Sequence, residues 1–131
     1  MHFSYGNAAV DGAPFNSWFV GNLNAWAYRA DSALAPPDFG LRLSENVEMK
    51  WGRHPAGEER KGWASCADKR TMSLLVRGRF LLRFRSATNR EAVREQRLER
   101  EGDYAVWGTD VEHTWVVEED AVIMTVRWTE A

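Results

Sequence analysis

The chain of 131 residues contains a single cysteine, no long uninterrupted apolar stretch and no excess of basic side chains. One cysteine, Cys66, excludes an internal disulfide framework and the paired cysteines of a zinc finger. The net charge of −2 and the lack of a basic stripe with interleaved aromatics argue against a nucleic-acid binder. Residues 6–29 carry few charges but include Asp11, Pro14 and several asparagines, so we expect no membrane span. Residues 1–20 lack a basic start followed by an apolar segment, which predicts a cytoplasmic protein without a signal peptide.

Tryptophan, by contrast, is abundant, with seven copies spread over the whole chain. Filling of the core is the simplest explanation of any single tryptophan, because each aromatic side chain buries a large area. A cavity for an organic ligand, lined by several of them, is the alternative. We expect four of them to line such a cavity, namely Trp51, Trp63, Trp107 and Trp115.

From residue 46 onward the sequence predicts short strands separated by turns. Residues 46–53 alternate Val47, Met49 and Trp51 with polar neighbours, the period of a half-buried strand. Two apolar segments separated by Gly78 predict a hairpin. The polar segment at 89–101 is rich in helix formers but makes no helical apolar stripe, which favours a strand with a polar outer face. Other strands are expected at 17–20, 41–43, 71–76, 79–85, 104–107, 113–117 and 121–128.

Many short strands, with neither an internal repeat nor a visible boundary, predict a single all-β domain with a sandwich or barrel fold. Residues 46–129 would form the barrel core, and residues 1–45 would form an extension of strands and loops. The segment PFNSWFVGNLNAWAY, residues 14–28, is apolar and aromatic. We therefore expect a homodimer that forms through residues 1–45.

A glycine- and histidine-containing segment resembles the second motif of the cupin superfamily. In that motif a glycine precedes a turn by five residues, and a metal-binding histidine follows the turn. Gly102, Gly108, Asp110 and His113 fit the spacing, with Gly108 and Asp110 in place of the usual proline and glycine. Glycine and aspartate suit a tight turn equally well. The resemblance, which extends to small single-domain bacterial cupins, implies an all-β, cupin-type double-stranded β-helix or jelly-roll barrel over about residues 46–129.

The first cupin motif, which supplies two further histidines and a glutamate to the metal site, is only partly present. Its closing glycine corresponds to Gly78, and its glutamate position is then occupied by Thr71. Most of the family's ligand set is therefore replaced, so the resemblance implies a barrel without a bound metal or other cofactor. The two histidine positions fall on Ala64 and Cys66, or on Ser65 and Ala67.

His113 is the first candidate catalytic residue, because the resemblance places it inside the barrel and histidine transfers protons near neutral pH. A hydrogen-bonded histidine in the barrel wall is the alternative. His54, in the loop sequence GRHPAGEE, is the second candidate. Together with a glutamate and His113 it could also form an unorthodox metal site, although the spacing does not require this.

A ligand also needs side chains that hold and orient it. Arg53 and Arg60 offer planar guanidinium groups that match a carboxylate, although surface pairing with a nearby glutamate is the simpler explanation. Strand alternation places Thr71 and Ser73 on one inward face, where they would orient a ligand or bond to neighbouring backbone groups. The predicted ligand-binding residues are Trp51, Arg53, Arg60, Trp63, Cys66, Thr71, Ser73, Trp107 and Trp115.

Three functions follow from these observations. The first is a small-molecule-binding cupin that acts as a metal-independent isomerase, cyclase or dehydratase on an organic metabolite. The second is a non-catalytic metabolite-binding or sensor protein, and the third is a metal-dependent enzyme that uses His54, a glutamate and His113. Some similar cupin-like proteins carry the label of signal peptidase, but the chain has no recognisable serine–lysine arrangement. We expect a small-molecule partner, with neither nucleic acid nor membrane.

Overall fold

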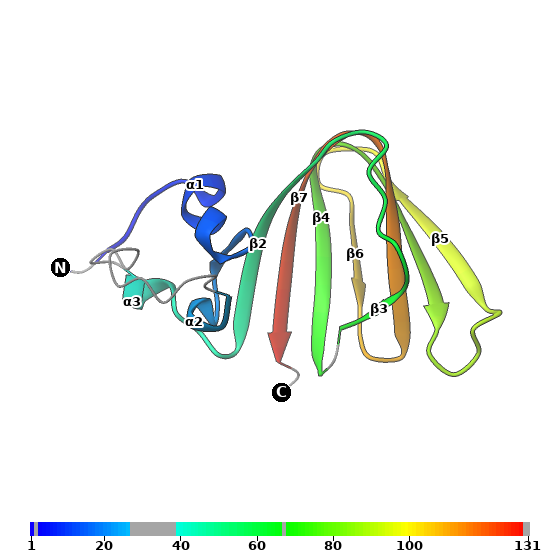
Figure 1. The fold of residues 1–131 in the computed structure, drawn as a ribbon, viewed down its shortest axis with the longest axis horizontal. Coiled ribbons are helices and arrows are strands. Elements are labelled where there is room, and N and C mark those ends of the chain that lie inside the picture. The colour runs from blue at the N-terminus through cyan, green and yellow to red at the C-terminus, as the bar shows by residue number, and fades with distance from the viewer. Residues whose placement is uncertain (2, 27–38, 67, 130–131) are drawn as a thin grey trace.

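The computed structural model describes residues 1, 3–26, 39–66 and 68–129. Ala67 and the end of the segment 14–28 lie outside these ranges. The described helical segments are short and lie on the side of the sheet that ends in β1 and β2 (Figure 1): α1 (Ala8–Gly12), the 3-10 turn η1 (Ala13–Phe15), α2 (Leu23–Trp26) and α3 (Phe39–Arg42). Among the described residues, seven strands join into one sheet: β1 (Trp18–Val20), β2 (Val47–His54), β3 (Ala64–Ser65), β4 (Lys69–Ser86), β5 (Val93–Leu98), β6 (Tyr104–Trp107) and β7 (Val111–Thr129).

β4 and β7 are long strands that pair with each other almost from end to end and bend together. Their register shifts between Leu75 and Phe80, and Gly78 lies in this bulge with a φ of +96°. A Cβ atom at Gly78 would collide with the backbone of Asp120 and Ala121, so this position requires glycine. The chain therefore bends at Gly78 without reversing its direction.

This bend corrects two predictions from the sequence. The hairpin expected around Gly78 is wrong, because residues 71–76 and 79–85 belong to the same strand. The two strands expected at 113–117 and 121–128 are likewise halves of β7.

The strand expected at 41–43 is also wrong, since α3 occupies most of it. The polar strand expected within 89–101 is confirmed by β5.

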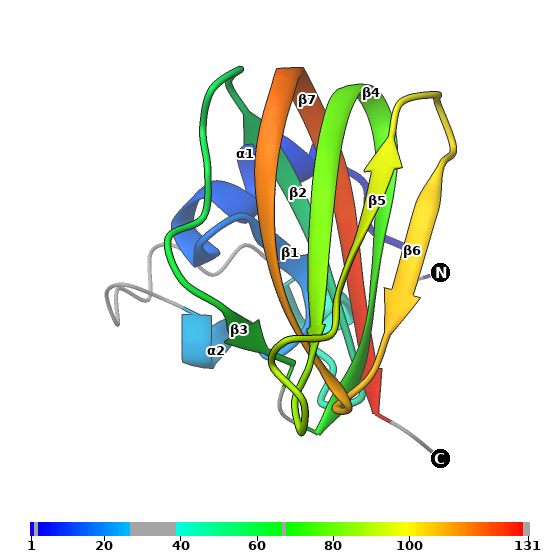
Figure 2. The same ribbon diagram turned by 90° about the vertical axis from the view of Figure 1, so that its right-hand side faces the viewer.

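The bend divides the sheet into two layers that face each other (Figure 2). One layer, called here the β2 layer, contains β1, β2, the second half of β7, the first half of β4, and β6. The other, called the β5 layer, contains β3, the first half of β7, the second half of β4, and β5. The resulting antiparallel jelly-roll architecture agrees with the predicted all-β fold.

Apolar side chains from both layers fill the space near the bend. Leu75 and Ile123 of the β2 layer and Phe80, Leu82 and Val117 of the β5 layer are all buried in one cluster. Burial of these side chains supplies the main driving force for joining the layers. None of the helices in the described part of the chain is long and apolar enough to cross a bilayer.

A second, smaller cluster lies at the outer edge of β2. It contains Phe15, Trp18 and Leu23, and the rings of Trp18 and Trp26 stack with centroids 5.3 Å apart. These aromatic side chains had suggested a dimer interface, but they pack against one another within the chain. The homodimer stays a prediction.

Candidate functional site

A cavity of about 150 Å³ lies between the two layers. The β2 layer contributes most of its wall, and the β5 layer faces it. The segment between β2 and β3 adds Arg60 at one side. From the β2 layer the wall contains Trp18, Lys50, Gly52, His54, Thr71, Ser73, Trp107, Ile123, Thr125 and Arg127, and from the β5 layer it contains Phe80, Leu82, His113 and Trp115.

Basic side chains give the cavity its charge. Lys50, Arg60 and Arg127 line it, and no carboxylate is among the described residues of the wall. The ammonium of Lys50 and the guanidinium of Arg127 both lie over the ring of Trp18, at 5.6 and 5.4 Å from its centroid. The cavity therefore presents concentrated positive charge in a partly buried place, where electrostatic interactions are stronger than in water.

Glu48 forms ion pairs with basic side chains but does not line the cavity. Its side chain is buried, and its carboxylate lies 3.6 Å from Nζ of Lys69 and 4.0 Å from Nη1 of Arg127. The indole Nε1 of Trp26 also donates a hydrogen bond to Glu48, at 3.3 Å. Glu48 thus holds Arg127 in place without itself lining the cavity.

His113 lies on β7, on the wall opposite Lys50. Burial and the positive charges of Arg60 and Arg127 lower its pKa to about 4. The imidazole is therefore neutral at pH 7, and its ring packs 4.9 Å from the ring of Trp107. A base with so low a pKa is a weak proton acceptor at neutral pH, so a hydrogen-bonding role suits His113 better than general-base catalysis.

His54 has the environment of an oriented base. Its Nδ1 lies 2.7 Å from Oε1 of Glu58, and its ring packs against Phe80 and Trp115. In the neutral ring Nδ1–H donates this hydrogen bond to the carboxylate, so the lone pair is left on Nε2. Nε2 would lie 2.7 Å from a Cβ at residue 52, so Gly52 leaves the room that this ring orientation needs.

The chain after β2 brings Glu58 to this position by running antiparallel to β7. The amide of Gly57 donates to the carbonyl of Val117, and the amide of Arg60 donates to the carbonyl of Trp115. These bonds place Glu58 beside His54 and Arg60 beside the cavity. The turn between His54 and Glu58 contains Gly57 with a φ of +87°, a conformation that favours glycine.

Among the described residues, those of the cavity wall carry most of the buried polar atoms that have no protein partner. In the described part of the chain, six side-chain nitrogen or oxygen atoms are buried without a hydrogen bond, and five of them belong to residues of the cavity wall. Buried polar atoms are normally hydrogen-bonded, so such a cluster indicates a place where a ligand supplies the bonds. The five atoms are Trp18 Nε1, Thr71 Oγ1, Trp107 Nε1, His113 Nδ1 and Arg127 Nε.

Solved structures with the same architecture are numerous. KdgF from Halomonas sp. superposes with a TM-score of 0.54 at 15% identity, covering 67% of this chain and 74% of that one. A cupin protein from Bacteroides fragilis gives a TM-score of 0.53 at 12% identity, covering 67% of this chain and 70% of that chain. An oxalate decarboxylase from Bacillus subtilis gives 0.56 at 17% identity, covering 70% of this chain but 23% of the larger enzyme.

This chain has the cupin fold. The fold predicted from the two motif segments is thereby confirmed. No protein-family model and no curated protein matches the sequence. At identities this low, likeness to solved structures establishes the arrangement of strands and says nothing about the reaction.

Residues at the metal-binding positions of the cupin motifs do not fit a metal ion. Thr71 and His113 do line the cavity, but Cys66 is buried in the core and Ala64 pairs with the backbone of His113. Nowhere in the described ranges do three His, Cys, Asp or Glu side chains come together in a group that could hold a metal. The cavity wall instead carries the basic side chains of Lys50, Arg60 and Arg127, which would repel a metal cation. The alternative site of His54, a glutamate and His113 is formed only as far as the contact between His54 and Glu58.

The cavity contains seven of the residues singled out from the sequence. The other four lie elsewhere. Trp51 and Arg53 are on the outer face of β2, Trp63 packs beneath the guanidinium of Arg85 at 4.6 Å, and Cys66 is in the core. The seven in the wall are His54, Arg60, Thr71, Ser73, Trp107, His113 and Trp115.

The orientation of β2 explains most of the difference. A period-two pattern defines the two faces of a strand but does not say which one is inside. The apolar face with Met49 and Trp51 was expected to point inward, yet the face with Lys50, Gly52 and His54 does so. Had His54 been used to assign the inner face, Lys50 would have followed from its position four residues earlier. The cavity residues that the sequence analysis missed are Trp18, Lys50, Gly52, Thr125 and Arg127, together with the apolar Phe80, Leu82 and Ile123.

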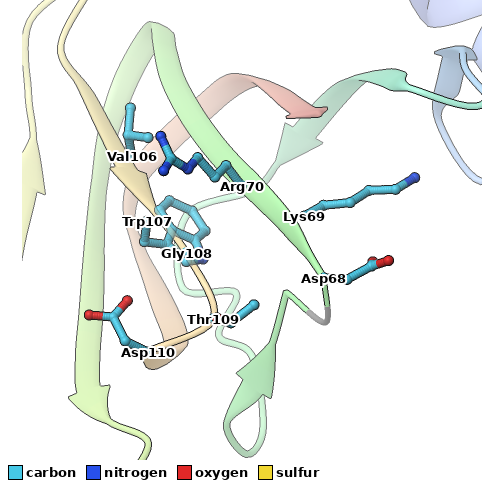
Figure 3. A pocket seen from close by; sticks show the side chains of 8 residues that line it. All are labelled: Asp68, Lys69, Arg70, Val106, Trp107, Gly108, Thr109 and Asp110. Atoms are coloured by element: carbon cyan, nitrogen blue, oxygen red, sulfur yellow. The ribbon is translucent and has the colours of Figure 1, made fainter. Parts of the chain in front are cut away.

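A separate groove of about 400 Å³ lies outside the barrel, between the start of β4 and the turn after β6 (Figure 3). Its wall mixes Asp68 and Asp110 with Lys69 and Arg70, so it lacks the single charge sign of the inner cavity. Trp107 lines both spaces and separates them. The inner cavity is thus the better candidate for ligand binding.

Proposed function

We propose that this cupin binds a small organic carboxylate inside its barrel. The carboxylate would lie against Arg127 and Arg60, and the apolar part of the molecule would lie against Phe80 and Trp115. The observation that carries the proposal is a cavity lined with cations, whose wall residues carry five buried polar atoms without a protein partner among the described residues.

The chemistry of these atoms selects the kind of ligand. The indole nitrogens of Trp18 and Trp107 and Nε of Arg127 can only donate hydrogen bonds. A ligand that satisfies them must therefore offer acceptor oxygens, and a carboxylate offers the most in the smallest space. Guanidinium–carboxylate bonds are also stronger than neutral hydrogen bonds.

The size of the cavity limits the ligand to a small metabolite. Pockets for drug-sized molecules are typically about 300–1,000 Å³, whereas this one measures about 150 Å³. Phe80, Leu82 and Trp115 present apolar side chains to whatever lies beyond the carboxylate. A short aliphatic or single-ring acid meets both conditions.

Replacing Arg127 tests the proposal. Tryptophan fluorescence and calorimetry would follow binding of acetate, pyruvate and benzoate, with acetamide and benzamide as uncharged counterparts. We expect the acids to bind and the amides not to bind. Arg127→Gln should weaken the acids about 10- to 100-fold, because a hydrogen bond to a charged group contributes about 1.5–3 kcal/mol.

Arg94→Gln is the matched control, since it removes the same charge from an exposed site on β5. It should leave the affinities unchanged. Equal binding of acids and amides, or equal effects of the two arginine variants, would overturn the proposal.

A second function, proton transfer without a metal, is favoured by the contact between His54 and Glu58. An oriented imidazole with Nε2 free to face a ligand is the arrangement of a general base. It would remove a proton from the carbon next to a carbonyl or carboxylate group. His54, and not His113, is then the base, because His113 has a pKa too low for the task.

Deuterium exchange into the methyl group of pyruvate, followed by NMR, would detect this activity. We expect exchange above the rate in buffer, loss of that exchange in His54→Gln, and an affinity for pyruvate within about twofold of the original. A protein that binds pyruvate without any exchange would instead support the non-catalytic alternative.

A further inference from the structure

Lys50 differs from the other two lysines of the chain. It is on β2 with its side chain in the cavity, whereas Lys61 is exposed and Lys69 pairs with buried Glu48 at 3.6 Å. In the described part of the chain no carboxylate lies within ion-pair distance of Lys50. Its amine therefore lies in the wall of a binding cavity with cations as its charged neighbours.

The surroundings of Lys50 make its amine easier to deprotonate than that of an exposed lysine. Burial lowers its pKa, and the charges of Arg127 and Arg60 lower it further. The shared ring of Trp18 keeps Lys50 and Arg127 close together, so this repulsion is built into the wall. A neutral lysine amine is a nucleophile, and desolvation beside another cation is one of the ways in which proteins produce one.

The neighbouring groups also indicate which electrophile the amine would meet. Arg127 and Arg60 flank Lys50 and suit a carboxylate, so a carbonyl next to that carboxylate would lie beside the amine. Thr125, opposite Lys50 in the strand pairing, also lines the cavity and offers a hydroxyl to the carbonyl oxygen. This arrangement matches a 2-oxo acid.

We propose that Lys50 forms a Schiff base with the carbonyl carbon of a 2-oxo acid held in the cavity. The inference rests on the proposed carboxylate binding and adds to it the class of acid and the covalent step. It gives Lys50 the role of a catalytic nucleophile.

The step needs no reactant besides the 2-oxo acid and one proton from the solvent. Nζ of the neutral lysine attacks the carbonyl carbon, and the carbonyl π electrons move to oxygen. Proton transfer from nitrogen to oxygen gives a carbinolamine, which loses one water as the C–O bond breaks and the C=N bond forms. One further proton converts the imine to an iminium, which withdraws electrons from the carbon beyond it and makes that carbon's proton easier for His54 to remove.

Reductive trapping tests the proposal directly. The intact protein would be incubated at neutral pH with pyruvate and cyanoborohydride, and the modified lysine would be identified by peptide mass spectrometry. We expect one adduct per chain on Lys50, formed at least about tenfold faster than on Lys61 or Lys69.

Two variants at Lys50 distinguish the loss of the nucleophilic amine from a loss of folding. Lys50→Arg keeps the positive charge and removes the nucleophile, and Lys50→Met keeps much of the length without a charge. Both should lose the adduct while their thermal unfolding remains cooperative. The double variant Lys61→Arg with Lys69→Arg should retain trapping, because Lys50 is then the only lysine in the chain.

The outcomes separate this inference from the proposed function. Saturable binding of pyruvate and acetate with no adduct on Lys50 would overturn the Schiff base and leave carboxylate binding intact. Adduct formation that is equal at all three lysines would also overturn it. Failure of both acids to bind, together with no selective adduct, would overturn both proposals.

Discussion

The two layers of the barrel are built largely from the same two strands, yet one of them contributes most of the polar side chains of the cavity. The β2 layer faces it with Lys50, Thr71, Ser73, Thr125 and Arg127. The β5 layer faces it with the side chains of Phe80, Leu82, His113 and Trp115. Because β4 and β7 cross the bend at Gly78, one half of each strand supplies polar side chains to the cavity, while both halves contribute to the core.

This difference separates the residues that stabilise the protein from those that would bind the ligand. Phe80 and Leu82 are almost completely buried and join the main core. Thr71 is equally buried but leaves its hydroxyl without a partner among the described residues. An unsatisfied buried polar group lowers stability by about 1–3 kcal/mol, so the β2 layer gives up stability at the places where a ligand would supply a bond.

The largest expected effect comes from shortening a buried side chain in the β5 layer. Phe80→Ala should lower the free energy of unfolding by about 3–5 kcal/mol, because it removes a buried ring and leaves a cavity. The ring also packs against His54 and Trp115, so carboxylate binding should weaken as well. Urea denaturation followed by circular dichroism would measure the change.

Ser73→Ala is the counterpart in the β2 layer and should change the free energy of unfolding by less than about 1 kcal/mol. The hydroxyl of Ser73 makes only a long contact of 3.5 Å with Thr125, and the net contribution of a typical hydrogen bond is about 0.5–1.5 kcal/mol. Similar losses in the two variants would show that the layers do not differ as described.

His113, a polar residue on the aromatic side, should make stability depend on pH. Its pKa is about 4 in the folded protein against an ordinary value of 6.5. Between these values the unfolded chain takes up a proton that the folded protein does not. The stability present above pH 6.5 is therefore lost as the pH falls toward 4, by on the order of 2–3 kcal/mol at 1.36 kcal/mol per pKa unit.

Chemical denaturation of the wild-type protein and His113→Asn at pH 7 and pH 4.5 would measure this. The variant should lose less stability on acidification than the wild type. A difference between the two proteins that is the same at both pH values would contradict the lowered pKa.

The smallest expected effect comes from Thr71→Val. Valine has nearly the shape of threonine without the unpartnered hydroxyl, so the variant should be as stable as the wild type or more stable, by up to about 1 kcal/mol. Carboxylate affinity should fall at the same time, because a bond to the ligand is lost. Thermal unfolding and calorimetry on the same samples would measure stability and carboxylate affinity. A variant that loses both would refute a ligand-binding role for the Thr71 hydroxyl.

Much of the fold was accessible from the sequence. The spacing from Gly102 to His113 indicated the barrel, and the structure places Gly102 in a turn with a φ of +92° and His113 in the cavity wall. β2, β5 and β6 were expected close to where they occur. The joins at Gly78 and around residues 118–120 were not, because a bulge that requires glycine and a turn that requires glycine look alike in a sequence.

The candidate site was accessible only in part. Motif spacing and strand alternation led to Thr71, Ser73 and His113, and these lie in the cavity wall. The same reasoning placed Trp51 inward and overlooked Lys50, because the inner face of β2 is the polar one. Apolar side chains usually face the core, and a strand that lines a polar cavity breaks that expectation.

The sequence by itself determined the strand-rich chain, the positions of its glycines and the absence of the usual cupin ligand residues from the motif positions, since these depend on residue type and local spacing. Only the tertiary structure decided that Lys50, Arg60 and Arg127 gather in one cavity, and that Glu58 orients His54. It also decided that five polar atoms of the wall residues are buried without a partner among the described residues. The physical reason is that residues far apart in the chain become neighbours only when β4 and β7 bend together and bring the two layers face to face.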